Sequence, residues 1–189
     1  MAKLVLNGST SGSVTLDVPA VAGTTTLTLP ANTGTVITTA STFGGTGPAF
    51  NAYATATQSI TTGTLTKIIL PNERFDTNSN FDSTTNYRFT PTVAGYYAIS
   101  GAIAINAPSS NTGAYAIIYK NGTGYAAAGG SGNTAMYPFP SVSSIVYCNG
   151  STDYVELYGY ISSATASTVA TIFVSGDNVY FNGFLARSA

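Results

Sequence analysis

The fold class of this 189-residue chain is decided by the stretch Phe89-Thr90-Pro91-Thr92-Val93-Ala94-Gly95-Tyr96-Tyr97-Ala98-Ile99-Ser100-Gly101-Ala102-Ile103. From Tyr96 onward the side chains alternate strictly between two sets. One set is apolar or small, and consists of Tyr97, Ile99, Gly101 and Ile103. The other set consists of Tyr96, Ala98, Ser100 and Ala102. Alternation with a period of two predicts a half-buried β-strand, because successive side chains of a strand point to opposite faces.

The same period recurs in two later segments, residues 154–161 and 179–185. In the first, Val155, Leu157, Gly159 and Ile161 alternate with Tyr154, Glu156, Tyr158 and Tyr160. In the second, Val179, Phe181, Gly183 and Leu185 alternate with Tyr180, Asn182 and Phe184. Helical spacing is not sustained anywhere. Short strands separated by Gly, Pro and Asn predict an all-β sandwich or jelly roll.

Both sets of these alternating side chains include large or apolar residues. An antiparallel strand with one face in water would carry polar groups on that face. We therefore expect a second buried surface between subunits, for which tyrosine is well suited because its ring is buried while its hydroxyl finds a partner. The alternative is an exposed aromatic binding patch. The candidate interface residues are Tyr97, Ile99, Tyr154, Tyr158, Tyr160, Phe181 and Phe184.

Residues 1–39 differ from the rest of the chain. They contain no aromatic residue, and Pro19-Ala20-Val21-Ala22-Gly23-Thr24 recurs as Pro30-Ala31-Asn32-Thr33-Gly34-Thr35. So small a strand-turn repeat cannot bury a core alone, so we expect an attachment segment that wraps against identical copies or a partner. A flexible Thr-rich linker is the alternative. The attachment candidates are Leu4, Leu6, Leu16, Leu27 and Leu29. A Gly-rich joint over 40–48 then leads to a head over 49–189.

The low charge of the chain limits its partners. Only 7% of the residues are charged, with six Lys and Arg against seven Asp and Glu. Because such a surface gives little electrostatic steering, we expect no nucleic-acid partner. No apolar run reaches the length of a membrane helix, so we expect no membrane insertion. Residues 1–7 do not form a signal peptide, which predicts folding in a cytoplasm.

Few residues could carry catalysis. With no histidine and one cysteine, Ser-His-Asp relays and zinc sites lack their usual groups. Cys148 is expected to be a small buried hydrophobic residue. The carboxylate pairs Asp153 with Glu156 and Asp76 with Asp82 leave a polysaccharide depolymerase as an alternative, although Asp153 also fits the end of a hairpin turn. We expect no enzyme.

The segment Asp76-Thr77-Asn78-Ser79-Asn80 offers oxygen atoms on alternate residues, as calcium loops do. An EF-hand is excluded, because Phe81 and Tyr87 occupy the positions where it needs Gly and Glu. A looser calcium site remains open, and a turn rich in Asx residues is the favoured interpretation. We expect no other cofactor.

Residues 49–185 resemble the globular domain of the C1q/tumour-necrosis-factor superfamily. Ala49-Phe50-Asn51-Ala52-Tyr53 is similar to its first strand, and Phe89 stands six positions before the turn Gly95-Tyr96-Tyr97, as in its central signature. Tyr119-Lys120-Asn121-Gly122 and Phe181-Asn182-Gly183-Phe184-Leu185 are similar to later strands. The chain departs from the family pattern at two points. The gap from Phe81 to Phe89 is one residue longer than the family's usual spacing, and Ile99 stands where the family has an aromatic residue.

The resemblance implies a ten-stranded jelly roll that forms homotrimers and has no catalytic activity. The N-terminal block resembles repeats at the starts of phage tail-fibre and virion proteins. We therefore expect a bacteriophage structural protein, assembled in the host cytoplasm and located in the virion. It would be a fibre or surface knob that contacts other phage structural proteins through residues 1–39 and host-surface glycans through loops such as 121–139. The alternatives are a capsid decoration protein without receptor binding and a tail depolymerase.

Overall fold

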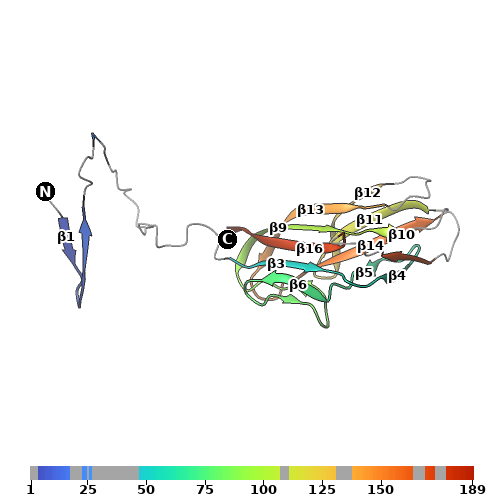
Figure 1. Ribbon diagram of the computed structural model, residues 1–189, viewed down its shortest axis with the longest axis horizontal. Helices are drawn as coiled ribbons and strands as arrows, with labels where there is room; N and C mark the ends of the chain where they lie inside the picture. Colours follow the sequence, from blue (N-terminus) through green and yellow to red (C-terminus); the bar gives the residue numbers. More distant parts are fainter. Residues whose placement is uncertain are drawn as a thin grey trace. The chain divides into compact units, whose positions relative to one another are not determined.

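The structure is a computed structural model that describes residues 4–17, 23, 24, 26, 47–106, 111–130, 138–163 and 178–189, and the backbone of 169–172. Within these ranges every regular element is a β-strand, as the sequence predicts. The chain divides into two compact units, Met1–Ser41 and Thr42–Ala189, of which the second is the head (Figure 1).

The head is a sandwich of two main antiparallel sheets. The first sheet has the order β13-β9-β16-β3-β6. Its strands are β13 (Ser141–Asn149), β9 (Ala94–Ala102), β16 (Tyr180–Ser188), β3 (Ala49–Tyr53) and β6 (Asn72–Asp76). In Figure 1 these strands run side by side across the head. We call this the five-stranded sheet.

The second sheet has the order β12-β11-β14-β8-β7, and β5 (Thr66–Lys67) also pairs with β14. Its other strands are β12 (Thr123–Gly130), β11 (Asn111–Lys120), β14 (Val155–Ser163), β8 (Arg88–Phe89) and β7 (Phe81–Asp82). A small third sheet joins β10 (Ile105–Asn106), β15 (Val169–Ile172) and β4 (Gln58–Thr61). The two five-strand paths agree with the ten-stranded jelly roll expected from the sequence.

An aromatic cluster lies between the two sheets. The Phe50 ring stacks on Phe89 with 4.3 Å between centroids and on Phe81 with 5.1 Å, and meets the edge of Phe181 at 5.3 Å. Phe89 in turn contacts Tyr97, whose hydroxyl donates a hydrogen bond to the Val93 carbonyl oxygen over 2.7 Å. Burial raises the pKa of Tyr97 to about 12. The rings that carried the sequence resemblance therefore form the core.

The longer gap between Phe81 and Phe89 does not disturb this cluster. The two residues face each other directly in the β7–β8 pair, so the turn between the strands absorbs the extra residue. Tyr87 in this turn has a φ of 49°, a left-handed conformation that is uncommon for a non-glycine residue. The side chain of Asp82 stabilises the turn, because its carboxylate accepts hydrogen bonds from the backbone N–H groups of Thr84 and Thr85.

The alternation that predicted the strands also identifies the core. Tyr97, Ile99 and Ile103 are buried, as are Val155, Leu157 and Ile161 on β14. Gly183 is favoured within this packing, because a Cβ atom there would lie 2.9 Å from the Ala98 carbonyl oxygen of the neighbouring strand. Cys148 is fully buried and its burial raises the pKa of the thiol to about 11, so the expectation of a small buried hydrophobic residue is confirmed.

The N-terminal unit contains a hairpin of β1 (Leu4–Asn7) and β2 (Ser13–Leu16). Leu4 faces Leu16 and Leu6 faces Val14, so these four aliphatic side chains share one face of the hairpin. All four are more than half exposed. An isolated two-stranded hairpin is at best marginally stable in water, and burial of this face against another surface would stabilise it. Leu27 and Leu29, the other attachment candidates, lie outside the described residues.

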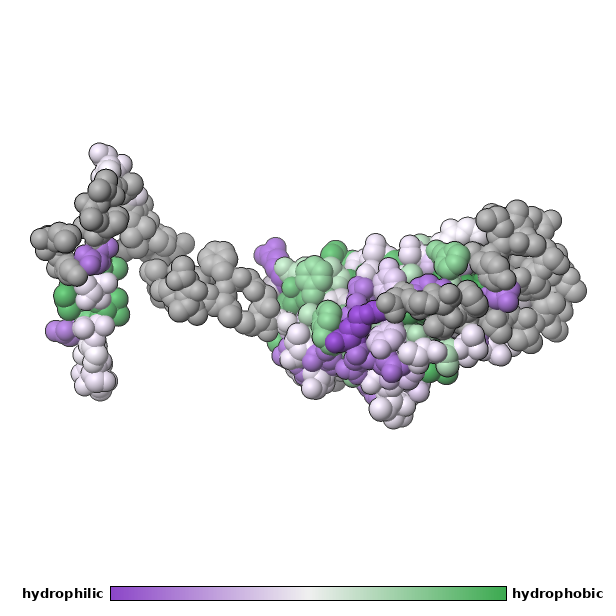
Figure 2. All heavy atoms as spheres, viewed as in Figure 1, coloured by the Kyte–Doolittle hydropathy of each residue, from purple (hydrophilic) through white to green (hydrophobic). Residues whose placement is uncertain are grey.

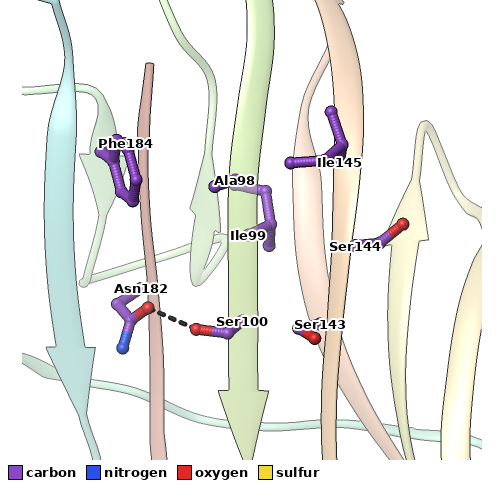
Figure 3. Close-up of a pocket in the computed structure, with 8 residues that line it drawn as sticks. All are labelled: Ala98, Ile99, Ser100, Ser143, Ser144, Ile145, Asn182 and Phe184. Atoms are coloured by element: carbon purple, nitrogen blue, oxygen red, sulfur yellow. Dashed lines mark hydrogen bonds between the residues drawn. The ribbon is translucent and has the colours of Figure 1, made fainter. Parts of the chain in front are cut away.

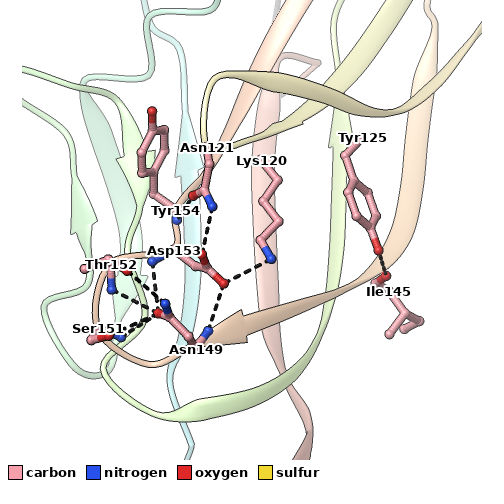
Figure 4. A network of polar contacts seen from close by, with 9 residues as sticks. All are labelled: Lys120, Asn121, Tyr125, Ile145, Asn149, Ser151, Thr152, Asp153 and Tyr154. Atoms are coloured by element: carbon pink, nitrogen blue, oxygen red, sulfur yellow. Dashed lines mark hydrogen bonds and ion pairs between the residues drawn. The ribbon is translucent and has the colours of Figure 1, made fainter.

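A polar network joins the ends of the two main sheets (Figure 4). The carboxylate of Asp153 accepts hydrogen bonds from the Asn121 side chain over 2.7 Å and from the Asn149 backbone over 3.0 Å, and pairs with Lys120 at 3.0 Å. Asn149 Oδ1 in turn accepts the backbone N–H groups of residues 151–153. The hydrogen bond from Asn121, with further contributions from Lys120 and Asn149, lowers the pKa of Asp153. Asp153 therefore lies at the end of the hairpin turn, as expected from the sequence.

Replacing Asp153 should destabilise the head in a pH-dependent way. At pH 7 we expect Asp153→Asn to lower the free energy of unfolding by about 1–3 kcal/mol, because a charged acceptor of several hydrogen bonds is lost. A carboxylate whose folded pKa is lowered stabilises the protein above its ordinary pKa of 3.8, and that stabilisation is lost as the pH falls through the folded value. Urea unfolding at pH 7 and pH 3 measures this, and the gap between variant and parent should narrow at pH 3. The exposed Glu73→Gln is the control, and an equal effect of both substitutions would contradict the assignment.

Candidate subunit interface

The outer face of the five-stranded sheet carries an apolar patch. The register of β13, β9 and β16 places Ile145, Ala98 and Phe184 side by side across the sheet. The next outward-facing row along the strands pairs Tyr147 with Tyr96, whose ring centroids are 5.4 Å apart. We call these five residues the apolar face.

The large side chains of the apolar face are unusually accessible for residues of their kind. Phe184 is 56% exposed, Ile145 54%, Tyr96 44% and Tyr147 40%. In Figure 2, green hydrophobic surface gathers at the end of the head from which the C-terminus emerges. Single exposed apolar residues are common on soluble proteins, but a contiguous patch marks an interaction site.

A hollow of about 350 Å³ lies within this surface (Figure 3). Ala98 is the small residue between Ile145 and Phe184, which stand at its sides. At one end Ser100 Oγ donates a hydrogen bond to Asn182 Oδ1 over 2.6 Å, which satisfies both groups within the sheet. The lining residues include no charged side chain, and are Ala98, Ile99, Ser100, Ser143, Ser144, Ile145, Asn182 and Phe184. Such a hollow suits an apolar side chain from another protein surface.

Polar residues border the apolar face, with Arg187 of β16 beside Tyr96 of β9 and a second group along β3 and β6. Beyond the Ser100–Asn182 pair, Asn182 faces Asn51 on β3, and Arg74 donates a hydrogen bond to Asn51 Oδ1 over 3.0 Å. The Arg74 guanidinium also lies 4.6 Å from the centroid of the Tyr53 ring. An apolar centre with a polar border is the usual anatomy of a protein–protein interface.

Three of the interface residues predicted from the sequence are wrong. Tyr97 and Phe181 are completely buried and Ile99 is 1% exposed, so the side chains of all three fill the core of one chain instead of standing on its outer face. Phe184 is on the apolar face. Tyr154, Tyr158 and Tyr160 lie on the outer face of the other main sheet, because their neighbours Val155, Leu157 and Ile161 fill the core.

Sequence reasoning missed Tyr96, Ile145 and Tyr147. The signal was present in both strands, since Tyr96 alternates with the buried Tyr97, and Ile145 and Tyr147 alternate with the buried Val146 and Cys148. To identify these three residues, one must know which alternating set of each strand faces the core, and the alternation alone does not say this.

The carboxylates that could have formed a catalytic pair are engaged in structural contacts. Asp153 is held in the polar network, and hydrogen bonds from the backbone of Thr85 and Thr84 lower the pKa of Asp82. A glycosidase general acid needs the opposite, a raised pKa. Glu156 is 3% exposed and forms an ion pair with Lys67.

The possible calcium loop is hydrogen-bonded as a turn. The Asp76 carboxylate accepts the backbone N–H groups of Asn78 and Phe81, and Asn80 Oδ1 accepts that of Thr92. Within the described part of the chain, no three His, Cys, Asp or Glu side chains gather to form a metal site. Nor does any described segment form a helix long and apolar enough to cross a membrane.

No protein-family model matches this chain, and a search of curated proteins also finds no match. Solved structures do match the head. The globular domain of zebrafish complement 1qA protein is 15% identical with a TM-score of 0.55, and the match covers 76% of this chain and 99% of that one. Eiger TNF from S. frugiperda is 6% identical with a TM-score of 0.57, and the match covers 76% of this chain and 95% of that one. Murine APRIL is 9% identical with a TM-score of 0.52, and the match covers 73% of this chain and 97% of that one. At these identities the likeness establishes the fold, and the head is a C1q/TNF-like jelly roll.

A charge placed on the apolar face should dissociate the assembled protein. We expect Phe184→Asp and Ile145→Asp each to convert oligomers to single chains at micromolar concentration, because each copy loses about 2 kcal/mol of apolar burial and gains a desolvated charge. Sedimentation velocity measures the change. Leu65→Asp is the control, since Leu65 is 46% exposed but lies outside the apolar face. If the sedimentation coefficients of Phe184→Asp and Ile145→Asp equal that of the parent protein, this face is not the interface.

Proposed function

We propose that this chain is a non-enzymatic structural protein of a bacteriophage particle, in which three heads pack together as a fibre tip or surface knob. The apolar face is the observation that carries the proposal. A sheet face that remains in water carries polar side chains, whereas Phe184, Ile145, Tyr96 and Tyr147 require cover. Three copies is the stoichiometry that the C1q/TNF resemblance implies.

The N-terminal unit attaches the head to other phage structural proteins in this proposal. Two observations support it. The hairpin of β1 and β2 has a continuous aliphatic face formed by Leu4, Leu6, Val14 and Leu16, and the segment resembles the starts of phage fibre and virion proteins. The protein would be assembled in the host cytoplasm and retained in the virion.

The work of such a protein is mechanical and adhesive, and it requires neither a cofactor nor catalysis. Asp82 and Asp153 support this part of the proposal, because their lowered pKa values suit permanently ionised structural groups. Three identical heads would present the same surface three times, so that weak contacts with host-surface glycans add up to useful avidity.

Incorporation into particles tests the proposal. We expect a tagged copy of the full chain to appear at a defined position when purified phage particles are imaged by immunogold electron microscopy. Leu6→Asp with Leu16→Asp should abolish incorporation without changing the mass of the assembled heads, because the aliphatic face of the hairpin is lost.

Thr15→Asp is the matched control, because Thr15 faces Val5 on the opposite side of the same hairpin. Label at fibre or tail positions supports the fibre role, and label over the capsid shell would instead indicate a decoration protein. Absence of the tagged protein from particles would overturn the proposal.

A further inference from the structure

A second aromatic surface covers the outer face of the sheet formed by β12, β11, β14, β8 and β7. Tyr115 faces Tyr160 across β11 and β14, with ring centroids 6.2 Å apart, and Ile117 faces Tyr158. Tyr119 stacks on Tyr158 at 4.1 Å. We call these five residues the tyrosine platform. It extends about 13 Å along β11.

The rings of the platform are half-buried, and they contact one another in the pairs Tyr115–Tyr160 and Tyr119–Tyr158. Each ring therefore has one face fixed by packing and is held in place before any ligand arrives, so that little conformational entropy is lost on binding. Burial, together with the negative charge of Glu156, raises the pKa of Tyr158.

The charged groups beside the platform are already paired. Lys67 forms an ion pair with Glu156 and donates a hydrogen bond to the Asn86 carbonyl oxygen. The Arg88 guanidinium lies 4.3 Å from the centroid of the Tyr154 ring. The Asp82 carboxylate accepts hydrogen bonds from the backbone N–H groups of Thr84 and Thr85 and from the side-chain amide of Asn86. Of the charged groups described beside this surface, Lys67, Glu156 and Asp82 are held by partners and Arg88 lies against the Tyr154 ring, so a ligand meets mainly phenol rings and hydroxyls, which favours an uncharged ligand.

Small residues flank the platform on β12. Ala127 faces Ile117, Gly129 faces Tyr115, and Gly124 faces Tyr119. None of these described β12 residues projects a large side chain over the platform. The platform spans only the two neighbouring strands β11 and β14, about 5 Å apart, over about 13 Å of their length, a footprint well below the roughly 800 Å² per partner that a stable protein interface buries. A narrow chain-like ligand fits this surface better than a protein does.

We propose that the tyrosine platform binds an uncharged glycan chain. The carbon–hydrogen face of a sugar ring stacks on phenol rings, and its hydroxyls exchange hydrogen bonds with phenol hydroxyls, so the two surfaces are complementary. The platform lies on β11 and β14, whereas the apolar face lies on the opposite sheet, so a trimer built through the apolar face leaves the platform displayed. In this respect the inference rests on the proposed function, and it gives that function a ligand class and a site.

Binding of neutral hexasaccharides by the full chain tests the inference. Maltohexaose, cellohexaose, mannohexaose and xylohexaose are titrated by calorimetry or ligand-observed NMR, and heparin serves as the anionic comparison. We expect at least one neutral hexasaccharide to bind and heparin not to. Tyr158→Ala should weaken that binding about tenfold, since one stacking contact is removed.

A second variant keeps the test decisive if Tyr158→Ala unfolds. Ala127 is exposed and faces Ile117, so Ala127→Arg leaves every ring in place while its long side chain covers the β12 side of the platform. This substitution should therefore also abolish binding. Phe75→Ala is the matched control, because Phe75 is an aromatic residue of the other sheet with 49% exposure, and it should bind as the parent does.

The inference is overturned if no neutral hexasaccharide binds at millimolar concentration, if heparin alone binds, or if Ala127→Arg binds normally. Light scattering on the same samples separates this failure from that of the proposed function. Trimers that bind no glycan would refute only the platform, whereas single chains would refute the trimeric assembly.

Discussion

This structure depends on one constraint, that successive side chains of a β-strand point to opposite faces of the sheet. On β9, β13 and β16 the inward set of side chains, with Tyr97 and Phe181 among them, completes the aromatic core around Phe50. Since successive residues must point in opposite directions, the remaining set, with Phe184, Ile145 and Tyr96, is forced outward. One sandwich cannot hide both sets. The core and the apolar face are therefore consequences of the same alternating sequence.

The two outer faces of the sandwich differ in chemistry, and this difference suits different tasks. The apolar face consists of large exposed side chains around a hollow without charge, which suits burial against another copy. On the opposite sheet, tyrosines pack against one another beside the ion pair of Lys67 and Glu156, which suits a surface that stays in water. The polar network around Asp153 fixes the ends of both sheets, and its Lys120 lies 5.7 Å from the centroid of the Tyr147 ring at the edge of the apolar face.

The sequence predicts the fold but does not show which side chains of each strand face outward, for a physical reason. Period-two alternation and the phenylalanines at 50, 89 and 181 depend on local spacing, which the sequence displays directly. Which set of a strand faces inward depends on the partner sheet, and both sets of β9 contain tyrosine. The alternation alone therefore makes Tyr97 an interface candidate, whereas the structure places Tyr97 in the core and Tyr96 on the outer face. Tyr158 and Phe184 were grouped together because only strand order shows that β14 and β16 belong to different sheets.

The mass of the unmodified protein in solution tests the central claim most directly. Multi-angle light scattering across low micromolar concentrations should give three times the mass of the 19.3 kDa chain, without a shift toward smaller species on dilution. A stable mass of one chain over the same range would mean that the exposed aromatic and aliphatic side chains tolerate water. That result would contradict the account.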